Sequence, residues 1–192
     1  MKQTTKKIIQ ALTYLANKEK DKIMDNMKAY KLLWLADRLH LRQTGRTITG
    51  DVYYAMPYGI VPSDAKCILE GTKTKLMNPK GYSSKYIEGQ NGHQFKALTD
   101  ADLKMFSDSD QEALDRVYSL YGHLDGKKLS EMSHKYPEWT FYRGLLEDKE
   151  QKNSYKVDLD HFFEEGPRSE LFNESKEMLE LTQAMYHKYN RY

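Results

Sequence analysis

The chain has 192 residues, of which 39% are hydrophobic and 30% are charged, a composition typical of one polar globular domain or of one domain with an appendage. The single cysteine, Cys67, excludes an internal disulfide bond, and no apolar run approaches the roughly 18 residues that a membrane-spanning helix needs. The first 20 residues contain neither the apolar segment nor the cleavage site of a signal peptide, so the sequence predicts a cytoplasmic protein.

The net charge of +2 hides an uneven distribution along the chain. Residues 1–50 contain 11 Lys and Arg against 4 Asp and Glu, whereas residues 101–192 contain 13 against 19. A basic first quarter is compatible with contact to nucleic acid. Lysines on the solvated sides of two helices explain the same pattern, and the acidic second half would weaken any attraction to phosphate. Nucleic acid is therefore not expected as a partner of the protein on its own.

The first half of the chain predicts two helices before any strand. Residues 4–16 place apolar side chains at helical spacing, and a charged linker, residues 17–22, follows. A longer helix is predicted from residue 24 to residue 43, and Gly45 is placed to end it. Its predicted polar face consists of Lys28, Lys31, Arg38 and Arg42.

A short strand, residues 51–56, and a stiff corner between Pro57 and Pro62 interrupt this helical pattern. A helix ending at Leu69 is predicted next, with Ser63 or Asp64 as its N-cap. Residues 84–89 and 93–98 flank a Gln-Asn-Gly turn and are predicted to form a β-hairpin.

The second half is predicted to be mainly helical. A short helix near residues 99–106 is followed by a longer one with Ser109 and Glu112 in capping-box spacing, and by a third that ends at Pro137. Residues 155–167 are predicted as a strand or turn, and residues 169–189 as an amphipathic helix. The predicted fold class is α+β, mainly α: a compact helical domain with a short central strand-and-corner and one small hairpin. The predicted divisions are 1–24, a helix and linker; 25–145, the domain; and 146–192, an extension packed on that domain.

Residues suited to catalysis or metal binding are scattered along the chain. Asp37 and His40 lie three apart on one helix face, where the carboxylate is able to raise the pKa of the imidazole, but no nucleophile is nearby and a structural pair is favoured. The sequence DLDHFFEE, residues 158–165, offers hard metal ligands without the spacing of a calcium loop, so a solvated acidic edge is favoured. Cys67 is interpreted as a small core residue. No catalytic residue, cofactor site or metal site is predicted.

Two separated elements carry a more specific pattern. The first is KLLWLADRLHLRQTGRTITGDVYYAMPYGIVP, residues 31–62, and the second is LSEMSHKYPEW, residues 129–139, with His134 and Trp139. Together they resemble the Panacea domain of the SocA-like antitoxins, a family that includes phage-associated proteins. The resemblance spans about residues 25–145, with Ile60 standing where the family usually has Pro. The residues of the first element that match the family pattern are Lys31, Leu32, Leu33, Trp34, His40, Gly45, Asp51, Ala55, Tyr58, Gly59, Val61 and Pro62.

The resemblance implies an antitoxin that binds and neutralises a toxin protein encoded nearby, without enzymatic activity. One branch of the family instead delivers its toxin to a protease, and such an adaptor would need a second docking segment, for which residues 186–192 are the candidate. A nucleic-acid-binding regulator is the third alternative. An enzyme would need His40 and His134 to converge with a carboxylate in one pocket.

Candidate residues follow from this interpretation. Strand side chains alternate between faces, so one of Tyr53 and Tyr54 is predicted to face the core and the other to point outward. Tyr58 in the corner is predicted either to fill a gap against the core helix or to contact the toxin. The candidate partner-binding residues are Tyr53, Tyr54, Tyr58, Lys31 and Arg38, and the candidate structural residues are Trp34, Asp37, His40, Gly45, Gly59, Pro62, His134 and Trp139.

Overall fold

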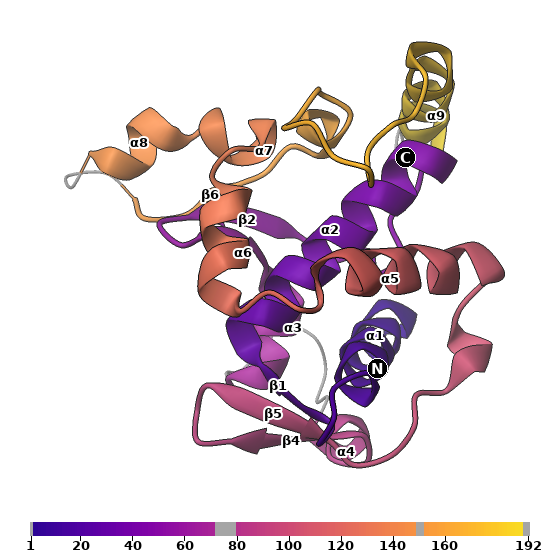
Figure 1. Cartoon of the computed structure of the whole chain (residues 1–192), viewed down its shortest axis with the longest axis vertical. Coiled ribbons are helices and arrows are strands. Elements are labelled where there is room, and N and C mark those ends of the chain that lie inside the picture. Colours follow the sequence, from indigo (N-terminus) through magenta and orange to yellow (C-terminus); the bar gives the residue numbers. More distant parts are fainter. Residues whose placement is uncertain (1, 72–79, 149–151, 190–192) are drawn as a thin grey trace.

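Helix α2 (Asn26–Thr44) runs through the middle of the molecule in the computed structural model, which describes residues 2–71, 80–148 and 152–189 (Figure 1). Asp25 caps its first turn by accepting a hydrogen bond from the Lys28 N–H, and Gly45 ends it in the left-handed conformation, φ 75°. Every residue from Ala29 to Arg42 is buried. The helix is therefore enclosed on all sides and has no solvated polar face along this length.

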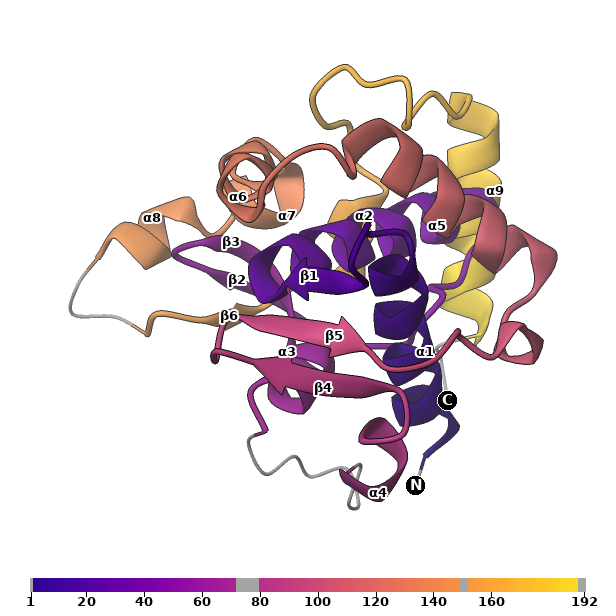
Figure 2. The ribbon, with the colours of Figure 1, turned by 60° about the horizontal axis from the view of Figure 1, so that its bottom comes forward.

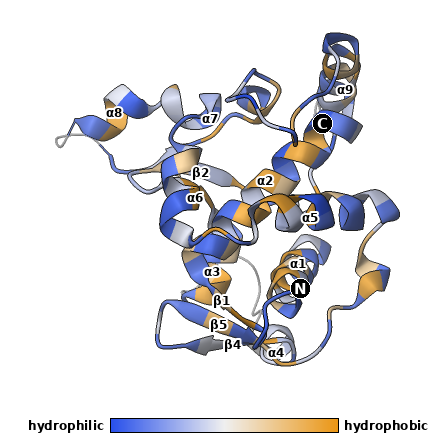
Figure 3. Ribbon diagram, viewed as in Figure 1, coloured by the Kyte–Doolittle hydropathy of each residue, from blue (hydrophilic) through white to orange (hydrophobic). Residues whose placement is uncertain are grey.

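Five other helices pack against α2. They are α1 (Gln3–Asn17), α3 (Ser63–Leu69), α5 (Asp108–Tyr121), α6 (Gly126–Ser133) and α9 (Lys176–Tyr189). Hydrophobic residues, orange in Figure 3, follow α1 and α2 where these helices form the core. Helices α1 and α9, from the N-terminal and C-terminal parts of the chain, both pack on α2 and so contribute to one core. No helix within the described residues is long and apolar enough to cross a bilayer.

The strands form two small antiparallel sheets. The first has the order β1 (Ile23–Asp25), β5 (Gln94–Ala97), β4 (Ile87–Gln90), and the second has the order β3 (Gly59–Pro62), β2 (Tyr53–Met56), β6 (Tyr155–Lys156). In Figure 2 the first sheet lies on one side of α2, and α6 lies on the other. The fold is thus α+β and mainly α.

The expected strand and corner are in fact a second β-hairpin. Met56 pairs with Gly59, so Pro57 and Tyr58 form a two-residue turn between β2 and β3. The described residues therefore form two hairpins, whereas the sequence predicted one. Strand β6 pairs with the other edge of β2. Strand β1 was also not predicted, because three residues within a charged segment carry no alternating pattern.

Several predicted helix boundaries are wrong. Pro137 begins α7 (Pro137–Thr140) rather than only stopping α6, as a proline at the first helical position can. The capping box of α5 is formed by Ser107 and Asp110, two residues before the predicted pair. The last helix begins at Lys176, seven residues later than expected. The remaining short elements are α4 (Lys80–Ser83), α8 (Arg143–Glu147) and the 3-10 helices η1 (Leu103–Met105) and η2 (Leu159–Phe162).

Helix α3 receives its cap from a distant residue. Its N-cap position is Pro62, which has no side-chain donor or acceptor, and neither Ser63 nor Asp64 takes the role predicted for it. The buried carboxylate of Asp51 instead accepts hydrogen bonds from the N–H groups of Asp64 and Ala65, at 2.8 and 2.9 Å. One side chain therefore joins the entry to β2 with the exit from β3.

Candidate functional site

The β2–β3 turn is held by side chains from α2, α6 and α7. Three of the five carbonyl groups at positions 56–60 accept a hydrogen bond from a side chain. Trp139 donates to Met56 at 2.9 Å, Ser130 to Tyr58 at 2.6 Å, and Lys31 to Ile60 at 2.7 Å. The turn thus has a fixed backbone, since each of these bonds reaches it from α2 or from the α6–α7 segment.

Gly59 allows this close approach. Its φ of 94° lies in the region that favours glycine. A Cβ atom at this position would lie 1.9 Å from Ser133 Oγ and 2.9 Å from Lys31 Nζ. Ser133 is itself fixed, because its hydroxyl donates to the Ser130 carbonyl at 2.7 Å. The turn and α6 are therefore in contact at a point where no side chain fits.

Lys31 does not lie on a polar face. Its side chain is fully buried, so the prediction of an exposed, partner-contacting Lys31 is wrong for the folded chain. Burial lowers the pKa of the Lys31 amine to about 7, and this amine donates to the Ile60 carbonyl. Lys31 therefore supports the turn from α2, through its hydrogen bond to the Ile60 carbonyl.

Arg38 is also buried, which overturns its predicted exposure. Its Nε atom donates to Glu138 Oε1 at 3.0 Å, and the indole of Trp34 donates to the same oxygen at 2.8 Å. Glu138 is fully buried and precedes Trp139 directly, so one short helix, α7, is joined both to α2 and to the turn. The sequence reasoning missed Glu138, Ser130 and Ser133, although all three lie inside or beside the quoted second element.

Asp37 and His40 do not bond each other, because the two side chains bond different segments. Asp37 accepts from the N–H groups of Ile48 and Thr49 and, at 2.7 Å, from the Tyr53 hydroxyl. His40 Nδ1 lies 2.9 Å from the Arg46 carbonyl and so carries the hydrogen in that bond. Burial lowers the pKa of His40, opposite to the predicted direction. Both residues fix the loop after α2.

The tyrosines of the hairpin differ in exposure. Tyr53 is buried and Tyr54 is half-buried, which confirms that one of the pair faces the core. Tyr58 is 71% exposed, so it does not fill a gap against α2. Its aromatic ring projects from a turn whose backbone is fixed at three carbonyls.

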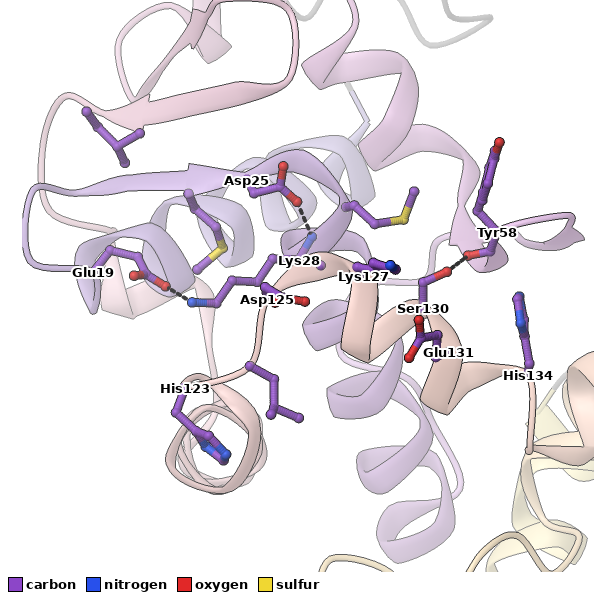
Figure 4. Close-up of a pocket in the computed structure, with 15 residues that line it drawn as sticks. Glu19, Asp25, Lys28, Tyr58, His123, Asp125, Lys127, Ser130, Glu131 and His134 are labelled. Carbon is purple, nitrogen blue, oxygen red and sulfur yellow. Dashed lines mark hydrogen bonds and ion pairs between the residues drawn. The ribbon is translucent and has the colours of Figure 1, made fainter.

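A groove of about 890 Å³ begins beside Tyr58. Figure 4 shows Tyr58, Ser130 and His134 at one end of it and Glu19 and His123 at the other. Four apolar side chains, those of Ile23, Met24, Met27 and Leu124, are among its lining residues. An exposed aromatic side chain on a fixed backbone, next to an apolar-lined groove, is the usual composition of a protein-binding surface.

The remaining candidates have structural surroundings. His134 stacks on Trp139 with ring centroids 4.1 Å apart, and it does not converge with His40. Among the predicted metal ligands, Asp158 caps η2 and His161 pairs with Glu164. No group of three or more His, Cys, Asp and Glu side chains suited to a metal ion occurs in the described part of the chain. Cys67 is half-buried, not in the core as predicted.

Comparison with known proteins gives one match. The family model described as antitoxin SocA-like, Panacea domain, matches residues 30–140. That range includes the three side chains that bond the turn carbonyls, whereas β6 and α9 lie beyond it. No curated protein and no solved structure matches the chain.

Proposed function

Because the chain belongs to the SocA-like antitoxin family with a Panacea domain, we propose that it is the antitoxin of a toxin–antitoxin system and neutralises a co-encoded toxin by direct binding. The observation that carries this proposal is the exposed Tyr58 side chain on the fixed β2–β3 turn. A rigid aromatic side chain loses little conformational freedom when it is covered, so more of its contact energy appears as affinity. We propose no chemical reaction for this chain, since covering the functional surface of the toxin is sufficient to neutralise it.

The groove beside Tyr58 supports a binding surface larger than one residue. Its apolar side chains come from β1, from the first turn of α2 and from the α5–α6 loop, which the fold brings next to the turn. A stable complex between two proteins buries roughly 1,200–2,000 Å² in total. We propose that the toxin covers Tyr58 and extends along this groove.

Charge neutralisation inside the chain supports a protein partner over nucleic acid. Of the 11 basic residues in positions 1–50, Lys31, Arg38 and Arg42 are buried. Five more form ion pairs with acidic residues: Lys7, Lys18, Lys22, Lys28 and Arg46. The basic first quarter therefore offers little free positive charge for phosphate contacts.

The test is co-expression with the product of the adjacent toxic gene, scored by growth and by co-purification. The Tyr58→Ala variant should lose rescue and complex together. Leu103→Ala is the matched control, because Leu103 on η1 is 51% exposed and does not line the groove. Rescue of growth with loss of the toxin from the cell, and without a complex, would instead indicate a proteolytic adaptor.

A further inference from the structure

Helix α9 carries an exposed hydrophobic stripe. Ten large hydrophobic side chains are exposed in the described part of the chain, and four of them are on this one helix. We name these four the α9 stripe: Met178, Leu181, Met185 and Tyr189. Their spacings of three, four and four residues align them along one side of the helix. Leu181, at 63% exposure, lies near the middle of the stripe.

The adjacent face of α9 fixes the helix to the domain. Leu179 and Thr182 are buried, and the Thr182 hydroxyl donates to the Arg42 carbonyl at 2.8 Å. A Cβ atom on Gly45 would lie 2.8 Å from the Thr182 carbonyl oxygen, which shows how closely the helix approaches the end of α2. Gln183 and His187 both contact Asp160 at 2.9 Å. The stripe is therefore held in place before any partner binds.

The exposed residues of α9 would match those of a second α9 helix that runs antiparallel to it. Leu181 and Met185 lie at equal distances on either side of Gln183, and Met178 and Tyr189 lie at nearly equal distances further out. Exposed Glu177 and exposed Lys188 lie at opposite ends and flank the stripe on the same side. In an antiparallel pair of α9 helices, each glutamate would face the lysine of the other copy, and apolar side chains would face apolar side chains.

We propose that the protein forms a two-fold symmetric dimer through antiparallel pairing of the α9 stripes of two copies. Symmetric interfaces of this kind use the same patch on both subunits, which is what the reversed order of α9 provides. Figures 1 and 2 both show α9 on the opposite side of the molecule from the β2–β3 turn. The dimer thus leaves two turns and two grooves exposed, and it goes beyond the proposed antitoxin function without depending on it.

The test is the mass of the purified full chain in sedimentation equilibrium over a range of concentrations. The wild type should be in monomer–dimer equilibrium, and Leu181→Glu should raise the dissociation constant by at least about tenfold, because a charge would enter the apolar contact. Leu103→Glu is the matched control: Leu103 is 51% exposed on η1, away from α9, and this variant should dimerise as the wild type does. Far-UV circular dichroism checks that both variants are folded.

A charge exchange separates the antiparallel pair from other uses of the stripe. Glu177→Lys alone should weaken the dimer, and the double variant Glu177→Lys with Lys188→Glu should restore it. A wild-type chain that stays monomeric, or a dimer unaffected by Leu181→Glu, overturns the proposal. A monomeric chain whose Leu181→Glu variant loses the toxin would assign the stripe to the toxin, and this also overturns it. Loss of toxin binding by Tyr58→Ala with the dimer intact keeps the two interfaces distinct.

Discussion

The side-chain nitrogen of Lys31 donates a hydrogen bond to the carbonyl oxygen of Ile60 at 2.7 Å, and neither residue has any surface exposed to solvent. Burial lowers the pKa of this amine from 10.5 to about 7. Between these two values the unfolded chain binds a proton at Lys31 that the folded chain has released. The free energy of unfolding therefore rises with pH across this window.

We predict a difference in pH dependence between the wild type and Lys31→Met. The wild type should gain stability as the pH rises above 7, by at most about 1.4 kcal/mol per pH unit, whereas the variant should lack this contribution. Urea denaturation at several pH values measures both, and the difference between them removes the effect of other titrating groups. Parallel pH profiles would contradict a buried amine with a lowered pKa.

Substitution of Gly59 by alanine should destabilise the hairpin. A Cβ atom would contact Ser133 and Lys31 at impossibly short distances, and φ is positive, so we expect a loss of about 2–5 kcal/mol in the free energy of unfolding. Gly92→Ala is the matched control, since Gly92 also has a positive φ but nothing within 4 Å. It should cost about 1–2 kcal/mol from strain alone. The additional change Ser133→Ala should recover part of the loss at Gly59; equal losses for the two glycine variants would exclude a steric cause.

Removal of the buried carboxylate in Glu138→Gln should cost about 3–5 kcal/mol, because Arg38 would remain charged and buried without its partner. Asp100→Asn is the comparison: Asp100 pairs with Lys22 on the surface, and its loss should cost less than about 1 kcal/mol. Replacing Arg38 by methionine in the Glu138→Gln background should recover stability. Thermal and urea denaturation measure the stability of the wild type and of these three variants. Similar losses for Glu138→Gln and Asp100→Asn would disprove a buried ion pair.

Tyr58→Ala should leave the melting temperature within a few degrees of the wild type, because the ring packs on little in the free protein. It should weaken toxin binding by about 2 kcal/mol or more, which is roughly 30-fold in Kd. Calorimetric titration of the purified toxin with each variant measures this change. A large loss of stability with unchanged affinity per folded molecule would make Tyr58 a structural residue.

The sequence pattern predicted the extent of α2 well and its surroundings poorly. Gly45 and the helical periodicity located the helix to within two residues at each end. The positions of Lys31 and Arg38 suggested a solvated face, because basic side chains are rarely buried unless they are paired. Their partners, the Ile60 carbonyl and Glu138, lie 29 and 100 residues away, and no local pattern predicts contacts at that separation.

The candidate site was predictable in part. Alternation along β2 predicted one buried and one outward tyrosine, and the two prolines predicted a stiff turn. The donors that fix the turn were not predictable as a set, since Ser130 and Ser133 resemble ordinary surface serines in the sequence. Family resemblance pointed to His134 and Trp139, but only the fold shows that Trp139 bonds the backbone of the turn and that His134 stacks on Trp139.

The hydrogen bond from Trp139 to Met56 joins residues 83 positions apart, and this separation has a consequence during synthesis. At the usual rate of about 5–20 residues per second, Trp139 follows the hairpin out of the ribosome by roughly 4–17 s. During that interval the nascent chain has the turn sequence and Lys31, but not Ser130 and Trp139, the other two side chains that bond the turn. Translation must therefore proceed past α7 before the Tyr58 surface reaches its final shape, and a chain interrupted earlier would carry the motif but not the folded turn.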